Sequence, residues 1–384
     1  FFFSVMSKRT MKLLVIGGGT GGLSTIVKLR KLDQALEIVL VEPKDFFEIS
    51  ASAYRSPFEN WVAEDALLPL DGFCTKNNVQ QIRDFVTKLD TNSATLAGGD
   101  VISFDLCLVA TGANADWKPL GRGPPSNKED ASREKRLQEM KDAGSRLIQA
   151  DSVLVVGGGL IGCELSADLA FYSKKAGNPT EVTLVHSGKH LIPEYDEKPA
   201  AMVQRKLEKL GVKVILNDKA IEQDGKFILQ SSNMEIGAKE IVKTVGFFAV
   251  NDFLKEGGFG DSLNEKGFIK TDSFLRVEGM SGKVFAIGDC CTHLPNAAFQ
   301  VVTASPILAN NLKVTLDALA EHRLLNAEPK LKEIVPVSPA PYLCTVGPND
   351  GVVFVKGYFH TQFILPRLKN KTMFHFKVKS DLGF

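Results

Sequence analysis

The sequence lacks the features that would place it at once in several classes of protein. Among its 384 residues, no apolar run approaches the roughly 18 residues that a membrane-spanning helix needs. Its six cysteines form no C-x-x-C pair and no metal-ligand spacing. Its net charge of +1 gives no electrostatic case for nucleic acid. We therefore expect no membrane span, no metal site and no nucleic-acid partner.

Cysteine use and the start of the chain bear on its location. Cysteines without a recognisable pairing pattern suit a reducing compartment, so we expect an intracellular protein. The sequence begins at Phe1 and not at a methionine, so no N-terminal address can be read from it. The neighbouring Cys290 and Cys291 are either redox-active or simply small residues at the end of a strand.

A glycine-rich turn follows the first apolar run, residues 13–16. Gly17, Gly19 and Gly22 fit G-x-G-x-x-G, in which the glycines allow a tight turn, close approach of a pyrophosphate and close packing of helix on strand. The phosphates would lie at a helix N-terminus. Glu42 ends the next apolar run, where a carboxylate accepts from ribose hydroxyls. Taken alone, these glycines have a purely structural turn as the alternative explanation.

The same pattern occurs a second time. Gly157, Gly159 and Gly162 follow the apolar run 153–156, and a further strand-like run, 182–185, comes after them. Two dinucleotide-binding units in one chain are difficult to explain by structural coincidence. We therefore predict an α/β fold with two Rossmann-like domains.

Two later apolar runs end in residues suited to a ligand. One stops at Thr111-Gly112 and the other at Gly288-Asp289. Ligands in open α/β sheets bind outside the carboxyl ends of the strands, so both positions are candidates for cofactor contact. A tight turn is the alternative for Thr111 and Gly112, and an N-cap of the next helix is an alternative for Asp289.

The C-terminal stretch differs in composition from the rest of the chain. Residues 356–384 hold six basic residues and one acidic residue, with apolar side chains between them. Such a segment is typical of a membrane-surface or quinone-facing region. A strand-and-helix cap with a solvated basic face explains it equally well.

Taken in order, these motifs resemble the two-dinucleotide-binding flavoproteins with the pyridine nucleotide-disulfide oxidoreductase fold. Residues 44–48, 182–188 and 346–352 are similar to the apoptosis-inducing-factor-like branch, which includes ferroptosis suppressor protein 1. Type II NADH dehydrogenases are the next most similar group. The resemblance implies an FAD-binding domain over 11–125 and 246–335 and an NAD(P)H-binding domain over 126–245. A small α+β region, 336–384, completes the chain as a possible membrane- or quinone-facing segment.

The resemblance also implies roles for individual residues. FAD would lie on the first unit and NAD(P)H on the second. Glu164 matches the family glutamate near nicotinamide and flavin, although a plain helix residue favoured by the helix dipole is the alternative. His186 stands where Glu42 stands in the first unit, so NADPH is tolerated as well as NADH. The cofactor-binding residues would be Gly17, Gly19, Gly22, Glu42, Thr111, Gly112 and Asp289 for FAD, and Gly157, Gly159, Gly162 and His186 for NAD(P)H.

Departures from the family pattern concern the electron acceptor. The C-x4-C pair of the disulfide reductases is missing between Phe46 and Arg55, which argues against dithiol chemistry. Of the glutamine-rich segment beside the quinone in type II dehydrogenases, only Gln300 matches. We predict an FAD-dependent NAD(P)H oxidoreductase that reduces a quinone at a membrane surface. The alternatives are a reductase of a protein acceptor and a non-catalytic subunit, and a homodimer is possible.

Overall fold

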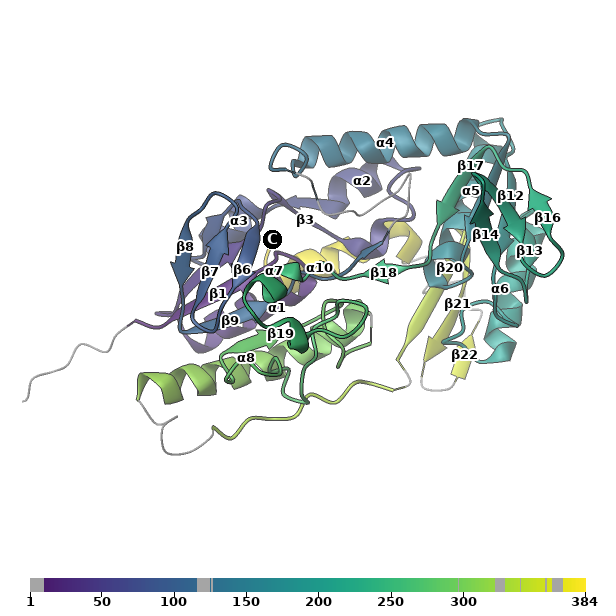
Figure 1. Cartoon of the computed structure of the whole chain (residues 1–384). Helices are drawn as coiled ribbons and strands as arrows, with labels where there is room; N and C mark the ends of the chain where they lie inside the picture. Colours follow the sequence, from purple (N-terminus) through teal and green to yellow (C-terminus); the bar gives the residue numbers. More distant parts are fainter. Residues whose placement is uncertain are drawn as a thin grey trace, which may run out of the picture.

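The computed structural model describes residues 10–115, 125, 127–295, 297–321, 329–338, 340–355, 358–360 and 369–384. Two parallel sheets organise these residues, each covered by helices (Figure 1). The predicted α/β class with two Rossmann-like units is therefore confirmed.

The first sheet has five parallel strands, and distant parts of the chain supply them. In spatial order these are β19 (Val284–Ala286), β9 (Leu106–Val109), β1 (Lys12–Ile16), β2 (Glu37–Val41) and β5 (Gln80–Ile82). The four apolar residues that end β1 are buried, as expected where helices cover a parallel sheet. Helix α1 (Thr20–Leu32) packs along α8 (Ala298–Ala320). The pairing of β19 with β9 returns the chain to the first unit after the second is complete.

The second sheet repeats the design with four parallel strands. Their order is β13 (Lys213–Ile215), β12 (Glu181–Val185), β11 (Ser152–Val156) and β17 (Glu240–Lys243). Helices α5 (Leu160–Lys175) and α6 (Glu197–Lys209) accompany it. A small antiparallel sheet follows, made of β14 (Ala220–Gln223), β15 (Lys226–Leu229) and β16 (Met234–Ile236).

Helix α4 (Arg133–Gln149) joins the two units. It begins where the Ser132 hydroxyl accepts the Lys135 N–H, which is an ordinary N-cap. It contacts α2 (Asn60–Ala66) and β4 (Leu67–Pro69) at one end and α5 at the other, and it runs across the top of the molecule in Figure 1. Its buried face consists of Arg136, Met140, Ala143, Gly144 and Leu147.

Shorter elements complete the first unit. Strands β6, β7 and β8 pair in sequence to form an antiparallel meander. The elements are β3 (Phe46–Glu48), η1 (Ser50–Ser52), α3 (Leu70–Lys76), β6 (Val86–Leu89), β7 (Ser93–Leu96), β8 (Val101–Ser103), β10 (Asn114–Ala115), β18 (Phe247–Phe248), α7 (Asp252–Glu256) and η2 (Gly260–Ser262).

The C-terminal region contacts both units. Strands β20 (Tyr342–Val346), β21 (Asp350–Val355) and β22 (Tyr358–His360) form an antiparallel sheet, and β20 packs against α5. Helix α10 (His375–Leu382) returns to the first unit, where Phe384 stacks on Phe47 with ring centroids 5.8 Å apart. In Figure 1 the yellow α10 accordingly lies among the purple and blue elements. The predicted domain limits at 125, 245 and 335 are consistent with this layout and stay proposals.

Several basic residues of this region are paired, so it is less charged at its surface than its composition suggests. Lys369 is buried beside Glu164, and Lys377 and Lys379 pair with Asp381 and Asp65. Phe363, Ile364, Leu365, Arg367 and Leu368, on which the membrane prediction also depends, lie outside the described residues. Among the residues that are described, no helix has both the length and the apolar character to cross a bilayer.

Candidate cofactor-binding site

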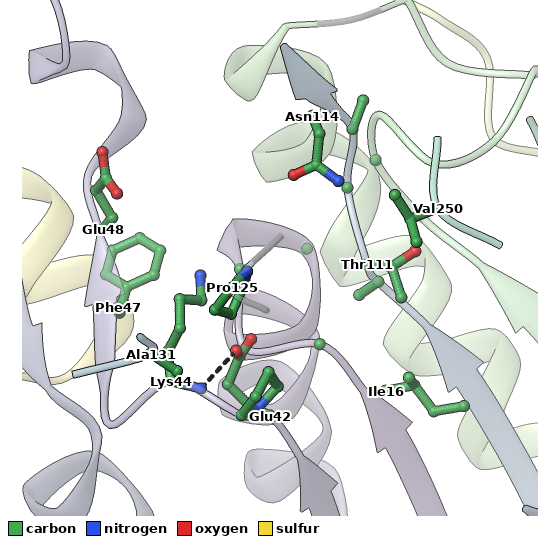
Figure 2. A pocket seen from close by; sticks show the side chains of 18 of the residues that line it. Ile16, Glu42, Lys44, Phe47, Glu48, Thr111, Asn114, Pro125, Ala131 and Val250 are labelled. Atoms are coloured by element: carbon green, nitrogen blue, oxygen red, sulfur yellow. Dashed lines mark hydrogen bonds between the residues drawn. The ribbon is translucent and has the colours of Figure 1, made fainter. Parts of the chain in front are cut away.

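A pocket of about 890 Å³ opens at the carboxyl ends of the first sheet's strands. This is the edge at which ligands bind in open α/β sheets, and the volume suits a cofactor. Gly17 and Glu42 lie on one side of it, beside β1 and β2, and Thr111 and Asp289 follow β9 and β19. Figure 2 shows Glu42 and Lys44 facing Thr111, Asn114 and Val250 across the pocket.

The first glycine turn has the close contacts that the motif requires. Gly17 has φ +104°, and a Cβ atom there would lie 2.4 Å from the Ala110 carbonyl oxygen. A Cβ atom on Gly22 would lie 2.3 Å from the Gly17 oxygen. Gly19 is open, because the Ala110 oxygen, 3.9 Å away, is the nearest atom to such a Cβ. Gly17 and Gly19 therefore line the pocket, whereas Gly22 allows α1 to pack on the turn.

Glu42 fixes this turn from the end of β2. Its Oε2 accepts the Gly18 N–H at 2.7 Å, and its Oε1 accepts the Lys44 N–H at 3.0 Å (Figure 2). The side chain is buried and lines the pocket. An ionised carboxylate offers about four lone-pair directions, so Glu42 can still accept from ligand hydroxyls.

Thr111, which follows strand β9, is held in place by a residue distant in the sequence. The hydroxyl of Thr111 and Asn251 Oδ1 are 2.9 Å apart, so the hydroxyl donates to this oxygen. The Asn251 amide donates in turn to the carbonyls of Gly267 and Cys290. The Thr111 hydroxyl is therefore used within the protein. Gly112, with φ +70°, lines the pocket beside it.

Asp289 lines the pocket at the end of β19. Helix α8 begins nine residues later, at Ala298, and its N-cap is Ala297. The interpretation of Asp289 as the N-cap of the next helix is therefore wrong. Because Asp289 lines the pocket, contact with a cofactor is the interpretation that remains.

The second glycine turn has the same construction. Gly157 has φ +114°, and a Cβ on Gly162 would lie 1.9 Å from the Gly157 oxygen. Gly159 has no atom within 4 Å of such a Cβ. His186 Nδ1 accepts the Gly158 N–H at 3.2 Å, as Glu42 does for Gly18 in the first turn. These residues do not line the pocket of the first unit, so the second turn is separate from that pocket.

Comparison with known proteins agrees with this geometry. A family model described as pyridine nucleotide-disulphide oxidoreductase matches residues 11–306. The chain belongs to this family. Members bind FAD and use NAD(P)H, and the two glycine turns, each with an open central glycine, fit these two groups. The chain is accordingly an FAD-dependent NAD(P)H oxidoreductase.

Similar relatives cover nearly the whole chain. Apoptosis-inducing factor homolog B of Dictyostelium discoideum is 28% identical over 98% of this chain and 98% of its own length. Ferroptosis suppressor protein 1 of Xenopus tropicalis is 25% identical over 99% and 98%. The predicted resemblance to this branch is therefore confirmed.

Solved structures show the same fold at lower identity. The sulfide:quinone oxidoreductase of Aquifex aeolicus has a TM-score of 0.73 at 17% identity, covering 97% of this chain and 92% of that one. The NDH2 of Plasmodium falciparum, in complex with NADH, has a TM-score of 0.65 at 16% identity, covering 97% and 98%.

In this oxidoreductase Glu164 is not among the residues that line the pocket of the first unit. It is 1% exposed, and its Oε1 accepts from Lys369 Nζ at 2.7 Å, from the Thr345 N–H at 2.8 Å and from the Thr345 hydroxyl at 2.7 Å. The structure thus ties Glu164 to the C-terminal region, and it does not line the pocket described above. A catalytic role for Glu164 stays a prediction.

Gln300 has a structural role that its sequence context did not suggest. It is 2% exposed, its amide donates to the Val337 carbonyl at 2.8 Å, and its oxygen accepts the Val337 N–H at 2.9 Å. Both ends of the amide therefore hold the segment around Val337 against α8. This residue is not available to an acceptor in this arrangement.

Sequence reasoning missed polar residues on the far wall of the pocket. Arg136 of α4 pairs with Glu48 of β3 through contacts of 3.2 and 3.3 Å, and both line the pocket. Burial acts to lower the pKa of Arg136, but Glu48 and Glu139 outweigh it and raise that pKa. No local motif marks either residue, because 88 positions separate them.

Proposed function

We propose that this oxidoreductase passes electrons from NAD(P)H through FAD to a quinone. The observation that carries the proposal is the pair of glycine cradles, one opening on the 890 Å³ pocket and one beside it on the second sheet. When bound, FAD supplies the chemistry that accepts a hydride and passes on electrons. The protein's own contribution is to bind and orient the two cofactors.

The first unit would hold FAD through residues that line its pocket. The backbone N–H of Gly19, the N-cap residue of α1, suits the pyrophosphate, and Glu42 suits the ribose hydroxyls. Gly17 shapes the turn, because its own N–H donates to the Val41 carbonyl at 2.9 Å. Thr111, Gly112 and Asp289 would border the remainder of the cofactor, and Gly22 acts by packing. On the second unit Gly157, Gly159, Gly162 and His186 would hold NAD(P)H in the same way.

Glu164 is proposed as a catalytic residue of this site. Lys369 and Thr345 surround its Oε1 with three hydrogen-bond donors, which fix the position of the side chain. It lies in the second turn of α5, shortly after the glycine turn, so a bound nicotinamide would be near it. Its part would be to border the nicotinamide, with its Oε1 held in place by Lys369 and Thr345.

A quinone is the acceptor best supported. The structurally similar Aquifex protein is a sulfide:quinone oxidoreductase, which is named for this class of acceptor. Exposed dithiol chemistry has no support, because all six cysteines are free and buried. Steady-state assays would test this choice. We expect NAD(P)H oxidation with a short-chain quinone; turnover only with an iron-sulfur protein would favour a protein acceptor.

We also propose peripheral contact with an intracellular membrane surface through the C-terminal region. Residues 356–368, together with Lys371 and the 58% exposed Phe376, would make it. Apolar side chains among basic ones bind anionic lipid surfaces. Co-sedimentation with anionic vesicles, before and after substitution of the basic residues Lys356, Arg367 and Lys371, tests the proposal. Unchanged binding would contradict it.

A further inference from the structure

Helix α5 carries a second buried carboxylate that the proposed mechanism does not use. Asp168 lies one helical turn after Glu164 and is 0% exposed. Arg55, from the first unit between η1 and α2, is also 0% exposed. Arg55 Nε lies 2.8 Å from Asp168 Oδ2, and Arg55 Nη2 lies 2.8 Å from Asp168 Oδ1. The two units thus meet in a bidentate ion pair with no access to water.

A third part of the chain closes this arrangement. The remaining terminal nitrogen of Arg55, Nη1, donates to the side-chain oxygen of Asn370 in the C-terminal region. Its neighbour Lys369 holds Glu164, and Tyr54, the neighbour of Arg55, contacts Thr345 through their hydroxyls at 2.9 Å. Glu164 and Asp168, on consecutive turns of α5, are therefore held by the C-terminal region and by the first unit respectively.

The Arg55–Asp168 ion pair contributes more to the relative orientation of the two units than to the free energy of unfolding. Burial raises the pKa of Asp168 to about 6, and Arg55 opposes the shift, so the carboxylate is ionised at neutral pH. Removing two charges from water costs several kcal/mol per ion, roughly what their attraction returns. What a bidentate guanidinium–carboxylate contact adds is a fixed relative direction, because both groups are planar.

The helix that the pair holds is the one that carries the nucleotide cradle. The N-cap of α5 is Gly159, the open glycine of the second turn. A rotation of α5 relative to the first unit would move bound NAD(P)H relative to FAD. A misplacement of about 1 Å is enough to slow a reaction about 100-fold.

We propose that Arg55 and Asp168, with Asn370, are positioning residues that set the second nucleotide-binding unit against the first for hydride transfer. They contact neither cofactor in this role and act through the direction of α5. The inference rests on the proposed assignment of FAD and NAD(P)H to the two cradles. It predicts a change in the rate of flavin reduction without a change in the affinity for either cofactor.

The test replaces both charges at once, because loss of one partner would leave an uncompensated buried charge. The holoenzyme variant Arg55→Met with Asp168→Leu keeps similar shapes and no net charge. We expect full FAD content and a Kd for NAD⁺ within about threefold of wild type, measured by calorimetry. The rate of flavin reduction by NADH in anaerobic stopped-flow should fall about 10- to 100-fold. An unchanged rate, or a loss of affinity that accounts for the whole decrease, would overturn the proposal.

A milder variant and a matched control complete the design. Arg55→Lys keeps the positive charge but loses the pair of guanidinium N–H groups that contact both oxygens of Asp168. It should retain the fold and slow flavin reduction severalfold, and it serves as the test even if the double variant does not fold. The exposed pair Lys226 and Glu235, replaced by Met and Leu, should change nothing. If wild-type protein itself is not reduced by NADH, the proposed function fails; if wild type and Arg55→Lys are reduced equally fast, only the positioning role fails.

Discussion

His186 Nδ1 accepts the backbone N–H of Gly158, the bond that a carboxylate makes in the first cradle. An acceptor at Nδ1 requires a neutral ring, and burial, together with His190, lowers the pKa of His186 and keeps the ring neutral. The second cradle therefore has no negative charge where the first has Glu42. We propose that this difference makes the second site tolerant of NADPH as well as NADH.

Substitution of His186 should change nucleotide preference. Wild-type protein should bind NADP⁺ and NAD⁺ with similar affinity, because nothing at this position repels a 2′-phosphate. His186→Glu restores the carboxylate and should weaken NADP⁺ relative to NAD⁺ by about tenfold through like-charge repulsion. Calorimetric Kd values for both nucleotides test this, with FAD content as the check that the first cradle is intact. Equal losses for both nucleotides would contradict it.

The packing role of Gly22 predicts a large effect from one methyl group. In Gly22→Ala the new Cβ would lie 2.3 Å from a backbone oxygen that cannot move aside. We expect a loss of about 2–3 kcal/mol in the free energy of unfolding, and reduced FAD content. Gly72→Ala is the matched control, because a Cβ there meets nothing within 4 Å and Gly72 lies in helix α3. It should be neutral or stabilising by up to about 1 kcal/mol.

Lys369 should matter for stability because it neutralises Glu164. Lys369→Met leaves a buried carboxylate without its cation, which typically costs about 3–5 kcal/mol. Glu164→Gln in the same chain should recover much of the loss, since no buried charge then remains. Urea unfolding of the single and double variants gives the comparison. Additive losses in the double variant would show that the two side chains are not coupled.

The docking of α10 should weaken in acid. His375 lies between Ser52 Oγ, at 2.6 Å from Nε2, and Asp65 Oδ2, at 3.0 Å from Nδ1. Burial lowers the pKa of His375, Asp65 opposes the shift, and Lys379 adds to it. A lowered pKa means that the unfolded chain binds the proton more tightly than the folded one. The stabilisation is therefore complete above pH about 6.5 and is lost as the pH falls through the folded-state value.

The variant His375→Gln isolates this effect. At pH 7.5 it should be less stable than wild type, and the difference should shrink as the pH is lowered to 5, because only the wild type titrates at this site. Denaturant unfolding at a series of pH values measures the difference. If the difference stays constant or grows as the pH falls, protonation of His375 does not weaken this contact, and the prediction is wrong.

Short sequence motifs were sufficient to predict the parts of the candidate site that are built from neighbouring residues. Gly17, Gly157 and their strands follow from short motifs, because the turn and its helix are built from adjacent residues. The residues missed depend on contacts between distant positions. Asn251 holds Thr111 from 140 residues away, and Arg136 meets Glu48 from 88. No periodicity or spacing in one sequence encodes such pairs.

The C-terminal region shows the same limit. Its basic composition predicted a surface segment, but composition does not reveal that Lys369 is buried or that His375 reaches Ser52, 323 residues earlier. Lys369 and His375 thus act in a connection between the two units and are not available to a membrane surface.

An anaerobic titration of the purified protein with NADH, and then with NADPH, tests the central claim most directly. The account predicts a yellow protein whose flavin absorbance is lost on addition of either nucleotide, with electrons then recovered by an added quinone. A yellow protein that neither nucleotide reduces would contradict the account and would favour a non-catalytic subunit. A protein that stays colourless after incubation with FAD would refute the assignment of the first cradle.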